Sequence, residues 1–204
     1  APIARNFGGA LYAHLFCHRD FENKRICTVS EYARKGLVRS FGSPKIADAV
    51  VRIWNSIDAV EGDIDRRPSG TITVLTLGHL VGYKNPRLWI EVARAIVREY
   101  PGRVRFAWAG EGAMREDLAR STASFPGIEF LGFVSDTHGL YSGADIYFQP
   151  SSIENHSISV IEAMAHAIPC VVSNVGGMTE SIEDGCEGFV LDPLDVEGYV
   201  SAIS

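Results

Sequence analysis

The sequence predicts an α/β fold in which a parallel sheet carries helices on both faces. From Thr71 onward, short runs rich in β-branched and aromatic residues alternate with helical patterns, which is typical of successive β-α-β units. Most of these runs are continuously apolar, as expected of strands that are covered on both sides. No internal repeat or low-complexity tract interrupts the alternation.

Strands are expected in this block at 71–77, 103–109, 128–131, 145–149, 170–173 and 188–191. The clearest helix begins after Asn85, because Asn85 is a good N-cap and Pro86 suits the first helical position. Its apolar residues recur on one face until the breaker at 101–102; they are Leu88, Val92, Ala93, Ile96 and Val97. Further helices are expected at 113–121, 137–142, 158–167, 178–183 and 195–203.

The first part of the chain does not follow this repeating pattern. It reads as a strand at 25–29, a helix from Glu31 to about Phe41 with Ser30 as its cap, and a strand at 49–54. The polar stretch at 55–70 then has the composition of a linker. We therefore expect two parts, residues 1–55 and residues 56–204.

Composition bounds the class of protein. The 204 residues are 46% hydrophobic, which is enough for a packed core, and the formal net charge of −6 argues against broad binding to nucleic acid. The chain has 4 cysteines, none in a CxxC pair or at zinc-ligand spacing, so we expect reduced and mostly buried thiols. With neither a signal peptide nor a run long enough to span a bilayer, we expect a cytoplasmic protein, with peripheral attachment to a membrane as the alternative.

Two short motifs have structural as well as functional interpretations. Gly110-Glu111-Gly112 lies between a strand and a helix, but Arg115 stands where a dinucleotide fingerprint has its third glycine, so turn geometry is favoured over a nicotinamide site. Asp63-Ile64-Asp65 resembles a metal-binding DxD pattern, but it lies in the polar linker, where a solvated acidic turn is the stronger reading. We therefore expect no metal site.

The segment 151–165 is the most informative. It follows an apolar strand, crosses a polar loop with Glu154, and enters a helix near Ser157 that carries Glu162. Carboxylates and free helix amides would then lie at the carboxyl end of a parallel sheet, where α/β proteins bind ligands, with the amides of Ser157 and Ile158 suited to a phosphate. A solvated Glu154 and a Glu162 paired with His166 are equally compatible with the spacing.

The chain resembles the retaining glycosyltransferases of family four, also called glycosyl transferases group 1, which have the GT-B architecture of two Rossmann-like domains. The resemblance runs from about Arg25 to the end, and its most specific element is a pair of glutamates separated by seven residues, Glu154 and Glu162. The other matching stretches, in order, are VSE at 29–31, NSID at 55–58, GHLVGYKNP at 78–86, AGEG at 109–112, LGFV at 131–134, EAMA at 162–165 and VGGMTE at 175–180.

The resemblance implies roles for individual residues. Glu154 matches the glutamate that binds the hydroxyls of the donor sugar, and Glu162 the one that binds the ribose of the nucleotide. Lys84 matches the basic residue that neutralises the diphosphate, while Phe133 and Val134 fall where the family lodges the base. The donor implied is a UDP- or GDP-linked hexose, used as substrate without a cofactor, and the acceptor is unspecified.

The chain also departs from the family pattern. His79 stands where an arginine is usual beside the first glycine, and Ser157 replaces the glycine of the phosphate loop, where it could add its hydroxyl. Residues 1–55 resemble only the end of the N-terminal acceptor domain, and His14 and His18 align with nothing, so the isolated chain is expected to be inactive or weak. The alternative is a non-catalytic nucleotide-binding or assembly module on the same fold, with a nicotinamide-dependent enzyme as a distant third.

Overall fold

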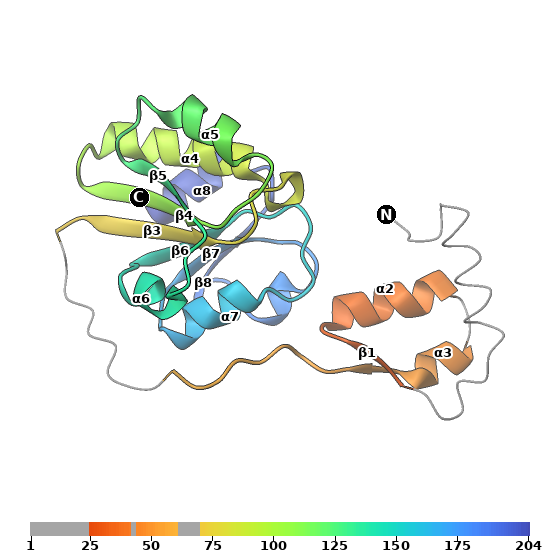
Figure 1. Ribbon diagram of the computed structural model, residues 1–204. Helices are drawn as coiled ribbons and strands as arrows, with labels where there is room; N and C mark the ends of the chain where they lie inside the picture. Colours follow the sequence, from red (N-terminus) through yellow and green to blue (C-terminus); the bar gives the residue numbers. More distant parts are fainter. Residues whose placement is uncertain (1–24, 42–43, 61–69) are drawn as a thin grey trace. The chain divides into compact units, whose positions relative to one another are not determined.

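The computed structural model in Figure 1 describes residues 25–41, 44–60 and 70–204. By its internal contacts the chain divides into two compact units, residues 1–55 and residues 56–204, and each is described by itself.

The described part of the first unit is a small α/β element. Strands β1 (Ile26–Thr28) and β2 (Val50–Arg52) pair in parallel. Helix α2 (Glu31–Phe41) follows β1 and is capped as predicted, because the Ser30 hydroxyl accepts a hydrogen bond from the amide of Ala33 at 3.0 Å. Helix α3 (Pro44–Ala49) was not expected from the sequence, although its first residue is a proline, a residue that suits the first turn of a helix.

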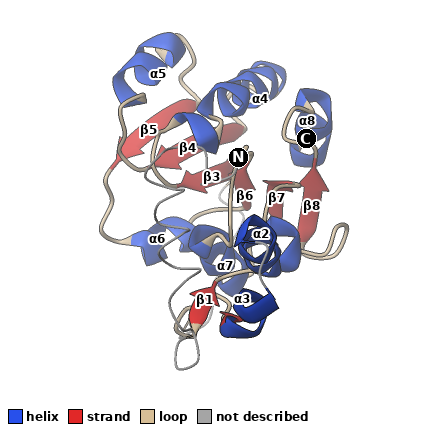
Figure 2. Ribbon diagram, turned by 90° about the vertical axis from the view of Figure 1, so that its right-hand side faces the viewer, coloured by secondary structure: helices blue, strands red, loops and turns tan. Residues whose placement is uncertain are grey.

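The second unit is built on a six-stranded parallel sheet with the order β5-β4-β3-β6-β7-β8, seen along its edge in Figure 2. The strands are β3 (Ile72–Leu77), β4 (Val104–Ala109), β5 (Ile128–Gly132), β6 (Ile146–Gln149), β7 (Cys170–Ser173) and β8 (Gly188–Leu191). The predicted fold class is confirmed, and the strand order is that of a Rossmann fold.

Helices cover both faces of this sheet (Figure 1). On one face lie α4 (Pro86–Glu99), α5 (Arg115–Thr122) and α8 (Val196–Ile203). On the other lie α6 (Thr137–Ser142) and α7 (Ile158–Ala165). Each face has its own buried hydrophobic cluster, which explains why the strands between them are apolar on both sides.

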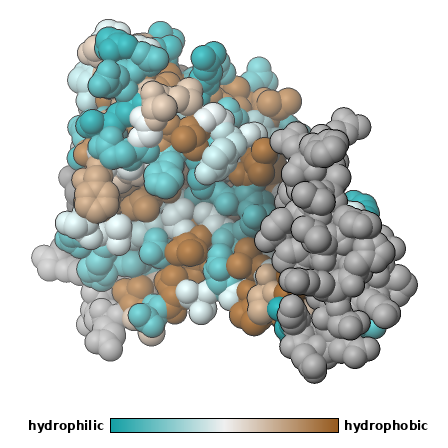
Figure 3. Space-filling model, turned by 45° about the vertical axis from the view of Figure 1, so that its right-hand side comes forward, coloured by the Kyte–Doolittle hydropathy of each residue, from teal (hydrophilic) through white to brown (hydrophobic). Residues whose placement is uncertain are grey.

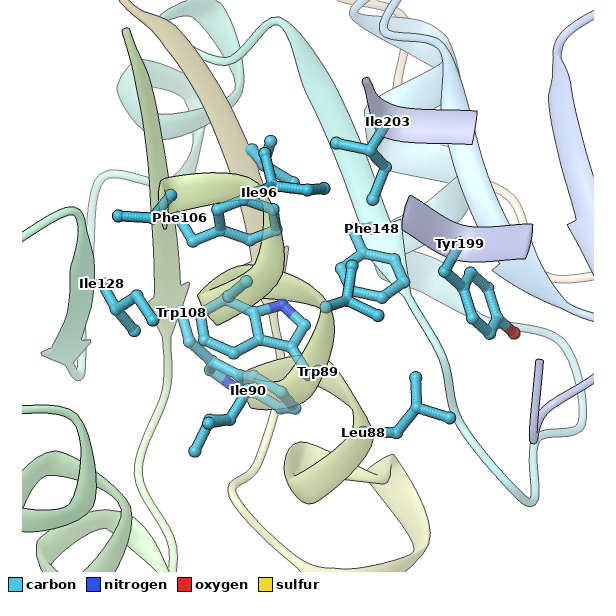
Figure 4. Packing of buried hydrophobic residues seen from close by; sticks show 14 of the residues in the cluster. Leu88, Trp89, Ile90, Ile96, Phe106, Trp108, Ile128, Phe148, Tyr199 and Ile203 are labelled. Carbon is cyan, nitrogen blue, oxygen red and sulfur yellow. The ribbon is translucent and has the colours of Figure 1, made fainter. Parts of the chain in front are cut away.

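The larger cluster is centred on Trp89 of α4, which is fully buried (Figure 4). Its ring meets Phe106 and Trp108 edge-on, with centroids 5.6 Å and 5.3 Å away. The indole N–H of Trp89 donates to the Thr76 hydroxyl at 2.7 Å, and that of Trp108 donates to the Gly78 carbonyl at 2.8 Å. The core therefore holds β3 and the backbone directly after it.

Three helical predictions need correction. Asn85 precedes α4 but makes no side-chain cap: its φ is 55°, and its amide group donates instead to the carbonyl of Pro193. Helix α7 ends at Ala165 rather than 167, because Ala167 adopts a φ of 52° and Pro169 follows. The helix expected at 178–183 is only a 3-10 turn, η3 (Met178–Glu180), since the amide of Glu183 donates to the Glu187 carboxylate.

Candidate functional site

Several predicted site residues follow β3 and β6, the two strands between which the strand order reverses. In this strand order β3 and β6 are neighbours whose following connections run to opposite sides, and such a point opens a crevice at the carboxyl ends of the strands. Strand β3 ends at Leu77 and leads into Gly78 and His79, and β6 ends at Gln149 and leads into the loop that carries Glu154. Both loops thus begin at the same edge of the sheet.

An ion pair joins these two loops. Lys84 lies in a 3-10 turn, η2 (Gly82–Lys84), and its ammonium is 2.5 Å from Oε2 of Glu154. The two side chains are 14% and 16% exposed, so they lie at the surface with most of their area covered. The turn itself is fixed, because the Tyr83 carbonyl accepts hydrogen bonds from both the amide and the hydroxyl of Ser152.

The glycines of the Gly110-Glu111-Gly112 motif allow close packing beside this site. A Cβ on Gly110 would lie 2.1 Å from the Gly78 carbonyl oxygen, and one on Gly112 would lie 2.4 Å from the Leu80 carbonyl oxygen. Because neither position has room for a side chain, the two backbones can run against each other. The motif therefore has a packing role here, which the sequence interpretation, based on turn geometry, did not include.

Gln149 is a residue that the sequence analysis missed. Its side chain is buried at the end of β6, with 1% exposed, and its amide nitrogen is 3.0 Å from Oε2 of Glu154 and 3.3 Å from the Ser151 hydroxyl. Its amide oxygen accepts from the hydroxyl of Tyr147 at 2.9 Å and from that of Ser159 at 3.0 Å. The available signal was a polar residue at the end of an apolar strand, directly before a proline.

Glu162 lies on the second turn of α7 and is held by a tyrosine of α6. Its Oε2 accepts from the Tyr141 hydroxyl at 2.9 Å, and the same hydroxyl is 3.0 Å from the carbonyl of Ser159. Burial raises the pKa of Tyr141, and the negative charge of Glu162 adds to this effect, so the phenol remains a donor. His166 contacts the Glu162 backbone carbonyl through Nδ1 at 2.7 Å and His138 through Nε2 at 3.0 Å.

Ser157 is the residue before α7, but its side chain does not cap the helix. The residue is 6% exposed, and its hydroxyl lies 3.2 Å from the amide oxygen of Gln149 and 3.0 Å from the Ser159 hydroxyl. The expectation that this hydroxyl would add a contact to a phosphate therefore needs correction, since the hydroxyl is turned into the buried network. The following residue, Ile158, is 51% exposed.

The remaining predicted site residues are less enclosed. Phe133, directly after β5, is 79% exposed, and its amide donates to the Glu111 carboxylate at 3.1 Å, whereas Val134 is half-buried. His79 is exposed. On the face seen in Figure 3, hydrophobic side chains form small patches separated by hydrophilic ones. The structure thus joins Lys84 to Glu154, and of the two residues expected at the base it leaves Phe133 open to solvent.

Other candidate features lie away from this edge or outside the described residues. A cavity of about 420 Å³ is lined at the amino ends of β3 and β4 by residues such as Thr71, Arg105 and Phe125, and contains none of the predicted site residues. Open α/β sheets bind ligands at the carboxyl ends of their strands, where Lys84 and Glu154 lie, and this cavity is at the opposite ends. The DxD motif at 63–65 and the histidines at 14 and 18 lie outside the described residues.

The thiols differ from the expectation that most are buried. Cys170 in β7 is buried, but Cys27 and Cys186 are exposed, and Cys17 lies outside the described residues. Cys27 belongs to the short strand β1, and Cys186 lies in the loop before β8. Within the described ranges, no group of three or more metal-ligating side chains comes together.

Comparison with known proteins identifies relatives for most of the chain. A family model described as glycosyl transferases group 1 matches residues 71–204. An uncharacterised glycosyltransferase of Methanocaldococcus jannaschii is 32% identical over 191 residues, which is 85% of this chain and 48% of the relative. A glycogen synthase of Mycobacterium tuberculosis is 31% identical over 189 residues, which is 89% of this chain and 45% of that enzyme. The chain thus spans about half the length of these relatives.

Solved structures agree on the fold. The chain matches the Anabaena protein HepE, solved in complex with UDP-glucose, with a TM-score of 0.80 and 19% identity over 100% of this chain and 58% of HepE. A glycosyltransferase from Rickettsia africae matches with a TM-score of 0.77 and 18% identity, over 95% of this chain and 55% of that protein. In the part of the chain that the structure describes, no helix is long and apolar enough to cross a membrane. The chain belongs to the glycosyl transferases group 1 family, and its second unit has the Rossmann-like fold of GT-B glycosyltransferases.

Proposed function

We propose that this chain is the donor-binding part of a retaining hexosyltransferase, which uses a UDP- or GDP-linked sugar to glycosylate a glycan, lipid or small-molecule acceptor. The observation that carries the proposal is the pair of Lys84 and Glu154, in contact at 2.5 Å where the carboxyl ends of β3 and β6 meet. The two groups can bind the two parts of a sugar diphosphate. The ammonium can pair with a phosphate, and the carboxylate can accept hydrogen bonds from the sugar hydroxyls.

The surrounding residues fit the other parts of such a donor. The backbone amides of Ser157 and Ile158, where α7 begins, can donate hydrogen bonds to a phosphate, because the first amides of a helix have no partner within it. Glu162, oriented by Tyr141, offers a carboxylate for the ribose, and Phe133 and Val134 offer apolar contact to the base. The relative HepE was solved in complex with UDP-glucose, which supports a uridine donor.

The proposed chemistry is transfer with retention at the anomeric carbon. As the bond from the anomeric carbon to the diphosphate breaks, negative charge develops on the leaving phosphate, and Lys84 with the amides of α7 stabilises it. The acceptor hydroxyl attacks from the face that the diphosphate leaves and passes its proton to the departing phosphate oxygen, so the new glycosidic bond has the configuration of the donor. Because Lys84 already supplies positive charge, we propose that the reaction needs no metal.

The acceptor site belongs, on this proposal, to an N-terminal domain of which residues 1–55 are the final part. The curated relatives are about twice as long as the matched region, which supports this view. The chain by itself is then expected to bind nucleotide weakly and to transfer little sugar. The free thiols of Cys27, Cys170 and Cys186 support a reducing compartment such as the cytoplasm.

Nucleotide titration of the 204-residue chain tests the proposal. Isothermal titration with UDP, UDP-glucose, GDP and GDP-mannose should show binding to one pair, with affinity unchanged when magnesium is replaced by EDTA. Lys84→Ala should weaken that binding at least about tenfold, because a charge-assisted contact to phosphate is lost. The matched control is Lys35→Ala, since Lys35 lies on α2 of the first unit with 64% of its side chain exposed.

The proposed role of Glu154 is tested by a second variant with its own control. Glu154→Gln should weaken binding of the nucleotide sugar much more than binding of the free nucleotide, because its carboxylate is proposed to hold the sugar. Glu116→Gln, on α5 with its side chain 88% exposed, should leave both unchanged. Sugar transfer by the purified chain at a rate that Glu154→Gln abolishes would contradict the expected weakness of the isolated chain.

The second candidate is a non-catalytic nucleotide-binding or assembly module. It is favoured by His79, which is exposed and stands where the family usually has an arginine. Binding of no nucleotide, or binding that Lys84→Ala leaves unchanged, would favour this candidate over the transferase.

A further inference from the structure

We propose that Gln149 is a positioning residue, which holds the carboxylate of Glu154 in place and joins it to the start of α7. The inference rests on the proposed function for its effect on the donor sugar, and on the structure alone for the geometry. Gln149 touches no residue of the proposed base or ribose site in the contacts described above, and it is too deeply buried, at 1% exposed, to meet a ligand directly. Its effect must therefore pass through the groups it holds.

The orientation of the Gln149 amide follows from its neighbours. An ionised carboxylate accepts hydrogen bonds but donates none, so the amide nitrogen has to face Glu154, which it does at 3.0 Å. The amide oxygen then faces the hydroxyls of Tyr147 and Ser159, each of which can donate to it, and the Ser157 hydroxyl lies 3.1 Å from the amide nitrogen and 3.2 Å from the amide oxygen. Both ends of the amide are thus matched to their surroundings, and a flipped amide would place its oxygen against the carboxylate.

Tyr147 fixes the orientation of the Gln149 amide further by donating a hydrogen bond to the amide oxygen. It is fully buried in β6, and its hydroxyl lies 3.2 Å from the Leu77 carbonyl oxygen and 3.3 Å from the Leu77 amide at the end of β3. Burial raises the pKa of Tyr147, so its hydroxyl keeps the proton that it offers to Gln149. The amide is therefore attached to β3, to β6 and to the first turn of α7 at once.

The network gives Oε2 of Glu154 a second partner besides Lys84. Oε1 accepts a hydrogen bond from the Asn155 amide at 3.3 Å, so the bond from Gln149 is the one that holds Oε2 when a ligand phosphate attracts the ammonium. This bond comes from a buried side chain that Tyr147 and Ser159 also hold, whereas lysine is a flexible chain. This difference is what makes Gln149, rather than Lys84, the residue that fixes where the carboxylate stands.

Two substitutions separate the two ends of the amide. Gln149→Glu keeps an oxygen for the hydroxyls of Tyr147 and Ser159 but replaces the nitrogen that donates to Glu154, Ser151 and Ser157 by a second carboxylate oxygen. Gln149→Leu removes both ends at similar volume. The control for loss of a buried polar group is Thr122→Val on α5, whose hydroxyl bonds only within its own helix in the contacts found, to the carbonyls of Leu118 and Ala119.

The first readout needs no nucleotide. Crystal structures of the native chain and of both Gln149 variants should show the Glu154 carboxylate displaced by about 1 Å or more, with β6 and α7 in place. A carboxylate that keeps its native position in both variants would overturn the inference. Because this readout is independent of the donor, it decides the role of Gln149 even if no nucleotide binds and the proposed function fails.

The second readout compares UDP-glucose with UDP by titration. We expect Gln149→Glu to weaken UDP-glucose about tenfold or more while UDP stays within about threefold, because only the sugar is proposed to contact Glu154. A general loss of structure would weaken both ligands equally, and Thr122→Val should weaken neither. Equal weakening of UDP and UDP-glucose would show a merely structural role and overturn the inference.

Discussion

Gly176 provides a sharp test of how the loop of Glu154 is supported. Gly176 lies after β7 with a φ of 59°, and a Cβ added to it would lie 1.6 Å from the carbonyl oxygen of Glu154. The atom it would meet belongs to the backbone and cannot turn aside, as the end of a flexible side chain could. Gly176→Ala must therefore move one of the two loops.

Gly185 offers a control with the same backbone requirement and no contact. Its φ is 80°, and a Cβ there would meet nothing within 4 Å. Gly185→Ala should cost about 1 kcal/mol, the penalty for a side chain in the left-handed region. Gly176→Ala carries that penalty and a further cost of about 1–3 kcal/mol for forcing packed backbone apart, so we expect about 2–4 kcal/mol in total.

Thermal unfolding and ligand binding together measure this difference. For a unit of this size the expected loss corresponds to a melting temperature lower by roughly 2–4 °C for Gly185→Ala and roughly 5–15 °C for Gly176→Ala. Only Gly176→Ala should also weaken UDP-glucose, since only that change displaces the loop of Glu154. Equal melting temperatures for the two variants would refute the reasoning, because they would show that the close approach has no energetic consequence.

Three further predictions concern groups elsewhere in the described chain. Burial lowers the pKa of His156, against a smaller opposing effect of Glu180, so the histidine contributes fully to stability above its unfolded pKa of about 6.5 and the contribution falls as the pH drops through the folded value. Melting curves at about pH 7.5 and about pH 5.5 should therefore show a smaller acid-induced decrease for His156→Gln than for the native chain; equal decreases would contradict this. Burial raises the pKa of Cys170 to about 12, so iodoacetamide should label Cys27 and Cys186 in the folded chain and Cys170 only after denaturation, as peptide mass spectrometry can verify. Trp89→Phe removes the donor to Thr76 and part of the ring contact, and urea unfolding should show a loss of about 1–3 kcal/mol; a loss below about 0.5 kcal/mol would contradict the packing seen around this ring.

The positions of the sheet strands could be predicted from sequence because buried parallel strands are continuously apolar. The predicted ranges 170–173 and 188–191 are those of β7 and β8, and the other four strands of the sheet differ by only one residue at an end. Helix ends were harder to predict, because they depend on contacts that periodicity does not contain. Asn85 illustrates this: its type suits a cap, but its side chain is drawn away by the carbonyl of Pro193, more than one hundred residues along the chain.

The site shows the same division between local and distant information. Glu154 could be picked out from its loop, and Lys84 from the resemblance of the stretch 78–86 to the family pattern. Nothing in either segment indicates that the two side chains meet. Their contact depends on β3 and β6 being neighbours, which is a property of strand order and not of either segment. Gln149 escaped notice for a related reason, since a polar residue at a strand end is usually solvated, whereas this one is buried and hydrogen-bonded to residues of its own strand, of the following loop and of α7.

Ser157 and Gln149 together change how one departure from the family pattern is understood. A serine in place of a glycine where a phosphate is expected could obstruct the approach, but the Ser157 hydroxyl is turned inward and bonded to Gln149. The side chain therefore occupies space in the buried network, and the contact to a phosphate is left to the backbone amide. On the proposed function, donor binding draws Lys84 toward the diphosphate, while the bond from Gln149 keeps the Glu154 carboxylate ready for the sugar. Serine in place of glycine at 157 is thus compatible with donor binding, because Gln149 holds the serine hydroxyl away from the phosphate.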